Sequence, residues 1–217
     1  MSYAESVAHS LLEINAVSLQ PEKPFTWASG MKSPIYTDNR LTISYPNVRQ
    51  AIVNSMEEQI KLHFPEATLI AGTATAGIPH ATGVAQQMSL PMIYVRSKPK
   101  DHGAGKQIEG VVKKDDKVVV IDDLISTGGS VLNAVKAVRD SGAEVLGVVS
   151  IFTYQLPAAE MNFKENNLPY YSVTNYSTLI HVAKEKELIS EEQLTSLKQW
   201  REDPLGWNDE RLTSVSA

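Results

Sequence analysis

The feature that most constrains this chain of 217 residues is residues 118–130, which read VVVIDDLISTGGS. The four leading branched apolar residues predict a strand that is buried on both faces. Two adjacent carboxylates, Asp122 and Asp123, follow where that strand is expected to end. A short loop of hydroxyl-bearing residues and glycines comes next, and a helical pattern begins at Val131. The segment therefore predicts a strand–loop–helix corner.

Such a corner suits a phosphate group. Gly128 and Gly129 let the backbone approach an anion, and the first N–H groups of the following helix point at it along the helix dipole. Ser126, Thr127 and Ser130 add hydroxyl donors. Because carboxylates repel phosphate, the Asp pair is better placed to accept hydrogen bonds from sugar hydroxyls or to hold a metal ion. The corner thus predicts a phosphorylated ribose as its ligand.

Other interpretations of this segment fit less well. An ordinary βα turn uses one or two of these features, whereas residues 118–130 combine all of them. A P-loop requires Ser or Thr after its Gly-Lys pair, but Gly105 and Lys106 are followed by Gln107. A dinucleotide-binding loop requires three glycines, but residues 72–77 have glycine only at their two ends.

The bulk composition narrows the class of protein. Hydrophobic residues make up 42% and charged residues 21%, which is ordinary for a globular protein of one α/β domain. A net charge of −5 gives the chain no net positive charge with which to bind nucleic acid. The absence of cysteine excludes disulfides and thiolate catalysis. The sequence has no apolar run of membrane-spanning length and no secretory pattern at its start. We therefore expect a cytoplasmic protein with neither a membrane nor a nucleic acid as partner.

Strand and helix patterns alternate through the middle of the chain, which predicts an α/β fold with a central, mostly parallel sheet flanked by helices. In such sheets, ligands bind beyond the carboxyl ends of the strands. We expect one domain over residues 1–217, with a ligand-binding core at 66–175 and a small N-terminal hood at about 1–45 plus C-terminal elements. The expected segments are strands at 69–71, 92–95, 118–121 and 145–151, an edge strand at 170–173, helices at 78–87 and 131–139, and a hairpin made of 25–29 and 34–37.

A second charged segment, residues 96–106, leaves the end of a predicted strand on the same rim as the phosphate corner. Its proline and two glycines oppose regular structure, so we expect a loop. A solvated charged loop would explain the charges alone. A departing diphosphate, however, needs positive charge in the transition state that is withdrawn again for product release, and a cationic lid provides both.

The corner resembles the phosphoribosyl-diphosphate (PRPP) signature of the type I phosphoribosyltransferases. Within them, the pattern Arg-x-x-x-Lys-Asp-His-Gly at 96–103 is similar to the catalytic loop of the orotate phosphoribosyltransferase family. Residues 25–34 and 72–79 agree with the same family. The similarity covers about residues 25–150.

The resemblance implies an enzyme that uses PRPP and Mg²⁺ to place ribose 5-phosphate on N1 of orotate, releasing diphosphate and forming orotidine 5′-monophosphate for pyrimidine biosynthesis. It implies a homodimer with shared active sites, in which the loop closes over the neighbouring subunit's site, and a magnesium ion held mainly by PRPP. The implied catalytic residues are Arg96, Lys100 and His102 on the diphosphate. The implied PRPP-binding residues are Arg96, Lys100, His102, Asp122, Asp123, Leu124, Ile125, Ser126, Thr127, Gly128, Gly129 and Ser130.

The chain also departs from the better-known enterobacterial branch of that family. Three lysines of that branch are replaced here by Ala28, Ala76 and Ser97, and residues 150–154 lack its orotate-binding arginine. We therefore hypothesise that Lys32 or Arg40, beside the predicted hairpin, supplies the missing positive charge for orotate. Ser126 is the third residue that we expect to approach the base.

Two other functions stay open from sequence alone. A purine or uracil phosphoribosyltransferase would share the PRPP corner, although such enzymes usually carry different lids. A PRPP-sensing regulator that binds nucleic acid would also keep the corner, but the net charge of −5 opposes it.

Overall fold

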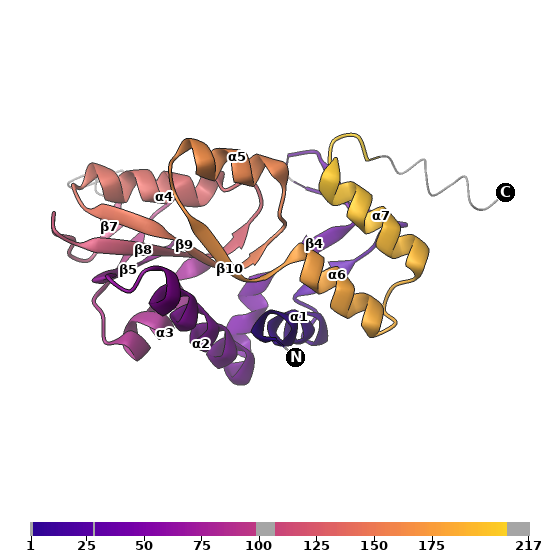
Figure 1. The fold of residues 1–217 in the computed structure, drawn as a ribbon, viewed down its shortest axis with the longest axis horizontal. Coiled ribbons are helices and arrows are strands. Elements are labelled where there is room, and N and C mark those ends of the chain that lie inside the picture. The colour runs from indigo at the N-terminus through magenta and orange to yellow at the C-terminus, as the bar shows by residue number, and fades with distance from the viewer. Residues whose placement is uncertain (1, 28, 99–106, 208–217) are drawn as a thin grey trace.

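The structure is a computed structural model, and it describes residues 2–27, 29–98 and 107–207. A six-stranded sheet in the order β10-β9-β8-β5-β6-β7 forms its centre (Figure 1). Neighbouring strands are parallel except for the antiparallel pair β6 and β7, so the predicted fold class is confirmed. The strands are β5 (Leu69–Thr73), β6 (Met92–Val95), β7 (Ile108–Glu109), β8 (Lys117–Ile125), β9 (Glu144–Thr153) and β10 (Tyr170–Asn175).

Strand β8 shows why four branched apolar residues stand together. Alternate side chains of a strand point to opposite faces of the sheet. Val118 and Val120 pack into one hydrophobic core, and Val119 and Ile121 pack into the other. All four side chains are fully buried, so the predicted burial on both faces is confirmed.

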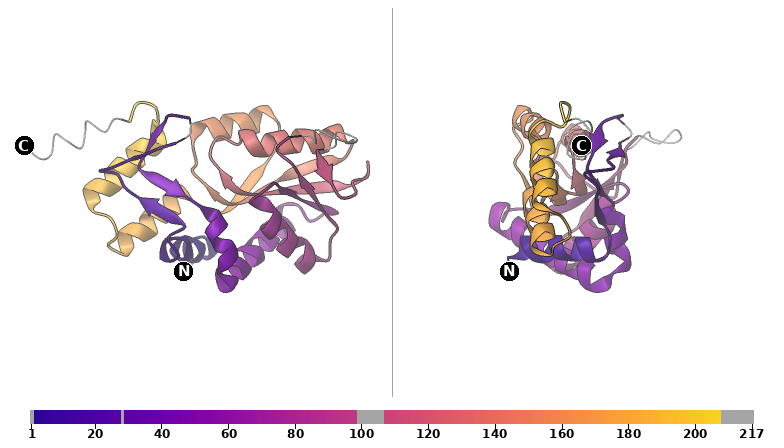
Figure 2. Two further views of the ribbon diagram at one scale, coloured as in Figure 1. Left: turned by 180° about the vertical axis from the view of Figure 1, so that it is seen from behind. Right: turned by 90° about the vertical axis from the view of Figure 1, so that its right-hand side faces the viewer.

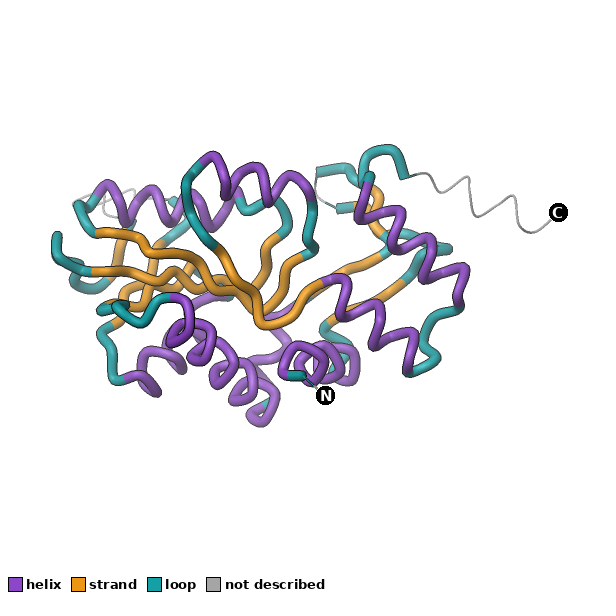
Figure 3. Tube along the Cα trace, in the orientation of Figure 1, coloured by secondary structure: helices purple, strands orange, loops and turns teal. Residues whose placement is uncertain are grey.

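Helices cover both faces of the sheet (Figures 1 and 3). The core around Val118 and Val120 includes apolar residues of α4 and α5, and the core around Val119 and Ile121 includes those of α1, α2, α3, α6 and α7. No helix in the described part of the chain combines the length and hydropathy needed to cross a membrane. The helices are α1 (Tyr3–Glu13), η1 (Asn39–Ser44), α2 (Pro46–His63), α3 (Gly77–Met88), α4 (Gly129–Asp140), α5 (Pro157–Glu165), α6 (Tyr176–Glu185) and α7 (Glu191–Glu202).

Four short strands, here called the hood strands, lie at one end of the molecule beside α6 and α7 (Figure 2). They are β1 (Val17–Leu19), β2 (Phe25–Thr26), β3 (Lys32–Ser33) and β4 (Ile35–Thr37). β2 pairs with β3, so the predicted hairpin is present, but its second arm is residues 32–33. The predicted arm at 34–37 is wrong, because β4 pairs with β1 instead. Pro34 has no N–H to donate to a ladder, and the chain changes partner strand at this residue.

The C-terminal helices are tied to the hood strands, although the sequence of this region carries little functional signal. Ser190 and Gln193 form a capping box that starts α7, as their spacing indicates. The Trp200 side chain of α7 is fully buried, and its Nε1 donates to the Lys32 carbonyl at 2.9 Å. This bond joins two segments that are 168 residues apart in the chain.

Candidate active site

The Asp pair lies inside strand β8 rather than after it. β5 pairs with β8 only as far as Ile121, opposite Gly72, while β9 continues to pair as far as Ile125, opposite Thr153. The expected strand end at residue 121 is therefore wrong, because β9 extends the ladder by four residues on one side. Asp122 lies level with Thr73, the last residue of β5, and Asp123 lies beyond it, at the carboxyl edge of the sheet.

Hydrogen bonds and burial set the charge state of this pair. Asp122 Oδ1 accepts from Thr73 Oγ1 at 2.5 Å and from the Asp123 amide at 2.9 Å. Burial raises the pKa of Asp122, and burial together with the neighbouring charge of Asp122 raises the pKa of Asp123 to about 7. Without a ligand, the pair therefore binds a proton near neutral pH. Hydroxyl donors or a cation would favour its fully ionised form.

A buried polar network holds η1 against the Asp pair. Asn39 Nδ2 donates to the Asp123 carbonyl at 2.7 Å, and Thr42 Oγ1 donates to the Asn39 carbonyl at 2.6 Å. His80 Nε2 lies 3.2 Å from Thr42 Oγ1, whose only proton is already donated, so Nε2 must carry the ring proton. Burial, aided by Arg49, lowers the pKa of His80 to about 4. The network is therefore neutral at physiological pH.

The phosphate loop requires glycine at Gly128. Its φ of +83° is a left-handed conformation, and a Cβ there would lie 2.7 Å from Phe163 of α5. Asn162, also on α5, donates to the Thr127 carbonyl at 2.8 Å. No described side chain caps the start of α4, which leaves its first N–H groups without a side-chain acceptor, a geometry that is compatible with the predicted anion site.

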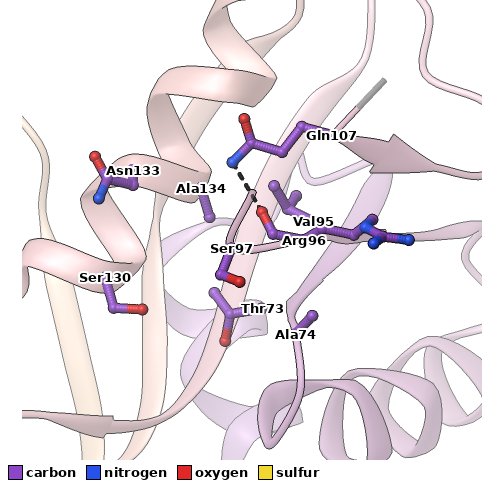
Figure 4. A pocket seen from close by; sticks show the side chains of 9 residues that line it. All are labelled: Thr73, Ala74, Val95, Arg96, Ser97, Gln107, Ser130, Asn133 and Ala134. Carbon is purple, nitrogen blue, oxygen red and sulfur yellow. Dashed lines mark hydrogen bonds between the residues drawn. The ribbon is translucent and has the colours of Figure 1, made fainter. Parts of the chain in front are cut away.

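A small cavity of about 50 Å³ joins the corner to Arg96. Figure 4 shows Ser130, from α4, facing Thr73 and Ser97 across this cavity, while the Arg96 guanidinium extends away from α4. Arg96 Nη1 lies 3.8 Å from Glu109 Oε1, and its carbonyl accepts from Gln107 Nε2 at 2.8 Å. The structure thus brings Arg96 and the phosphate corner to one cavity. Lys100 and His102 lie outside the described residues.

A larger cavity of about 400 Å³, here called the base cavity, lies on the other side of the corner. The rings of Trp27 and Tyr154, which both line it, are 5.0 Å apart between centroids. None of the described residues that line it is charged. They are Thr26, Trp27, Tyr36, Thr37, Leu124, Ser126 and Tyr154.

Of the other residues predicted to form the site, some line the base cavity and others do not. Ser126 and Leu124 line the base cavity, whereas the Ile125 side chain is fully buried in the core beneath α4 and α5. Neither Lys32 nor Arg40 lines that cavity. Arg40 instead donates to both carboxylate oxygens of its neighbour Asp38, at 2.6 and 2.8 Å.

Sequence reasoning missed several residues that the fold brings to this edge. The hydroxyl of Thr73 reaches Asp122 from β5, Asn39 reaches Asp123 from η1, and Thr37 and Tyr154 enter the base cavity from β4 and from the residue after β9. The available signal was weak: Thr37, Thr73 and Tyr154 stand at or next to the carboxyl end of an apolar strand, and residues 150–154 drew attention only for the arginine that they lack.

The side chains at this site can also be compared with those that usually bind a metal ion. Within residues 2–27, 29–98 and 107–207, no group of three or more His, Asp or Glu side chains could hold one. Magnesium usually keeps several waters and is bound by one or two carboxylates together with substrate phosphates. The Asp pair fits that description, because it offers two adjacent carboxylates beside a phosphate-binding loop.

At one edge of an α/β sheet, the corner offers the backbone N–H groups, hydroxyls and carboxylates that a phosphorylated sugar would need. A family model described as the phosphoribosyl transferase domain matches residues 44–173, and the chain belongs to this family. Within the family it belongs with the orotate phosphoribosyltransferases. It is 58% identical over 207 residues to the orotate phosphoribosyltransferase of Streptococcus pyogenes serotype M12, covering 95% of this chain and 99% of that one.

Solved structures agree with this family. An orotate phosphoribosyltransferase from Aeropyrum pernix has a TM-score of 0.72 and 25% identity, covering 85% of this chain and 99% of its own. The structure of Leishmania donovani UMP synthase has a TM-score of 0.77 and 27% identity over 91% of this chain. The present chain spans 42% of that larger protein.

Proposed function

We propose that this chain transfers ribose 5-phosphate from PRPP to N1 of orotate, giving orotidine 5′-monophosphate and diphosphate in pyrimidine biosynthesis. The observation that carries the proposal is the order of groups along one edge of the sheet. Thr73, which donates to Asp122, lines the small cavity together with Arg96 and Ser130, whereas Leu124, the residue after Asp123, lines the base cavity together with Ser126. A ribose at the Asp pair would therefore have a base on one side and a diphosphate on the other.

In this proposal, catalysis consists of positioning and electrostatic stabilisation. Displacement at C1 of the ribose passes through an oxocarbenium-like centre as the diphosphate departs, and orotate N1 is the nucleophile. Asp122 and Asp123 hold the ribose hydroxyls, and residues 126–130 hold the 5′-phosphate. Arg96, Lys100 and His102 stabilise the charge that develops on the diphosphate.

Magnesium belongs to the same proposal. The Asp pair would contribute carboxylate oxygens, and the substrate's own oxygens would provide most of the ligands. When bound, the ion would neutralise part of the negative charge on the diphosphate. The proton that burial places on the Asp pair would then leave, because a nearby cation lowers a carboxyl pKa.

Lys32 and Arg40 remain candidates for attracting the orotate carboxylate from outside the base cavity. Arg40 lies near enough to Tyr36 and Asp123 for their charges to interact. Its guanidinium is already paired with Asp38 and mostly exposed, so its attraction for orotate should be weak and sensitive to salt. An Arg40→Ala protein with an unchanged orotate KM at low ionic strength would remove Arg40 from the site.

The assembly and location of the enzyme are also proposals. We propose a homodimer with shared active sites, in the cytoplasm. Tyr36 of β4, Leu41 of η1 and Tyr45, which follows η1, expose 45%, 40% and 44% of their surfaces. If these side chains form one patch, it would favour contact with a partner. Sedimentation equilibrium should give twice the mass of one chain, and a monomer at micromolar concentration would contradict the dimer.

One assay tests the reaction. The protein is mixed with PRPP, Mg²⁺ and, separately, orotate, uracil, adenine, hypoxanthine and xanthine, and consumption of each base is followed. We expect orotate alone to be consumed, with diphosphate released in equal amount. Consumption of a purine or of uracil instead of orotate would assign a different phosphoribosyltransferase. No consumption of any base, together with retained PRPP binding, would favour a regulator.

A further inference from the structure

The base cavity poses a chemical problem for an anionic substrate. Orotate carries a carboxylate, yet none of the described residues that line this cavity has a positive charge. The polar groups on its wall are mostly hydroxyls, from Thr26, Tyr36, Thr37, Ser126 and Tyr154. An anion that is desolvated without a cation must receive hydrogen bonds from neutral donors.

Tyr154 is the most firmly held of these hydroxyl-bearing residues. It is only 2% exposed, and its amide donates to the Ile125 carbonyl at 3.0 Å, which fixes it against the end of β8. Its ring contacts Trp27 at 5.0 Å, Phe152 at 5.3 Å and Trp200 at 6.1 Å between centroids. The phenol therefore has little freedom to rotate away from the cavity.

Gln155, the residue after Tyr154, fixes the backbone of this segment. Gln155 has a left-handed φ of 55°, which is uncommon for a residue with a side chain. Its Oε1 accepts from both the amide and the hydroxyl of Ser177, at 3.0 and 2.7 Å. These two bonds hold the turn that presents Tyr154 to the cavity.

Thr37 supplies a second unusual feature. It is 7% exposed, and its Oγ1 is buried without a hydrogen-bond partner among the described residues. A buried polar atom without a partner is costly, and a bound ligand could satisfy it. Thr37 also adjoins Tyr154: its hydroxyl and amide lie near enough to the phenol to lower the pKa of Tyr154, although the hydroxyl does not reach it with the geometry of a hydrogen bond. Burial nevertheless raises the pKa of Tyr154, so the phenol keeps its proton and remains a donor throughout the neutral range.

We propose that Tyr154 and Thr37 are the specificity-determining residues for the base, and that their hydroxyls donate hydrogen bonds to oxygens of orotate in place of a cation. This inference rests on the proposed function, and it adds the residues and the kind of contact that select the base. Lys32 and Arg40, which do not line the cavity, would then act only at a distance.

A Tyr154→Phe protein tests the inference, because it keeps the ring and removes only the hydroxyl. Hydrogen bonds to charged groups are strong enough that orotate KM should rise by about tenfold or more, while PRPP KM should stay within about twofold. Tyr171→Phe is the matched control, since Tyr171 stacks on His63 and lies outside the base cavity. A purely structural loss in Tyr154→Phe would change both KM values or lower the unfolding temperature.

Thr37→Val provides a second test that does not depend on Tyr154→Phe folding, and it should raise orotate KM with the same selectivity. If both variants keep the wild-type orotate KM, the inference is wrong while the proposed function stands. If the wild-type protein itself fails to consume orotate, the proposed function is wrong, and the inference falls with it.

Discussion

The two halves of the candidate site are built in opposite ways. The sugar-phosphate corner is one continuous segment, residues 122–130, in which strand, loop and helix follow one another. The base cavity is assembled from β2, β4, the end of β8 and the residue after β9, with α7 packed behind it. A phosphate needs a particular backbone conformation, which a short sequence can encode. A planar base needs walls on several sides, which only separate parts of the chain can provide.

This contrast leads us to expect that substitutions in the two halves of the site affect different substrates. Substitutions in the corner should change the kinetics of PRPP, whereas substitutions in or behind the base cavity should change those of orotate. The predictions below are ordered from the largest expected effect to the smallest.

The largest effect is expected at Lys100, for which the family resemblance implies a role in binding the diphosphate. Lys100→Ala should lower kcat by roughly 10²–10³, or about 3–4 kcal/mol, the scale for losing one preorganised charge contact in the transition state. PRPP affinity should fall much less. Steady-state kinetics with Lys98→Ala, from the same segment, is the control. A loss of kcat below about fivefold would exclude a transition-state role for Lys100.

Gly128 and Gly129 provide a matched pair within the corner. Gly128→Ala combines a left-handed φ with a Cβ 2.7 Å from Phe163, so it should cost about 2–3 kcal/mol and lower the unfolding temperature by roughly 4–12 °C. PRPP KM should rise as the loop shifts. Gly129→Ala meets only Thr127 Oγ1, at 3.9 Å, and should fold normally. Equal melting temperatures for the two variants would contradict this account of the loop.

Asp123→Asn should separate stability from activity. The folded protein holds the pKa of Asp123 at about 7, above that of an unfolded Asp, so ionisation destabilises the unliganded fold as pH rises from about 4 to 7. The variant should therefore melt higher than the wild type above pH 7, on the order of 2 kcal/mol or about 4–8 °C, and this difference should shrink towards pH 4.

The same substitution should raise PRPP KM, because an amide replaces a carboxylate acceptor for the ribose hydroxyls. In the wild type, PRPP KM should likewise rise as pH falls below 7 and Asp123 takes up its proton. Thermal melts from pH 4 to 9 and kinetics across the same range provide both measurements. A variant that melts lower than the wild type at pH 8 would show that burial does not strain this pair.

The smallest effect is expected behind the base cavity. Trp200→Phe removes the bond from Nε1 to the Lys32 carbonyl and leaves a small void beside Tyr154, at a cost of about 1–2 kcal/mol in stability. Orotate KM should rise by about three- to tenfold, while PRPP KM should not change. An equal change in both KM values would show that the two halves of the site are not independent.

Much of the core could be predicted because short stretches of its sequence indicate whether a residue is buried and which backbone conformation it adopts. Val118 to Ile121 are branched and apolar without interruption, so only a strand covered on both faces accommodates them. Gly128 encodes the turn, and Ser190 with Gln193 encodes the start of α7. Local patterns were less reliable at strand ends: β8 runs past residue 121 because β9 continues beside it, and β4 leaves the predicted hairpin for β1.

From the order of its residues alone, this chain determined a mostly parallel α/β sheet and a strand–loop–helix corner at 122–130, because backbone conformation and strand burial depend on neighbouring residues. Tertiary structure alone decided which distant side chains meet there. Asn39 against Asp123, Thr37 beside Tyr154 and Trp200 behind the base cavity all depend on how separate elements pack. Such contacts arise from the burial of whole helices and strands against one another, and no local pattern in the sequence encodes them.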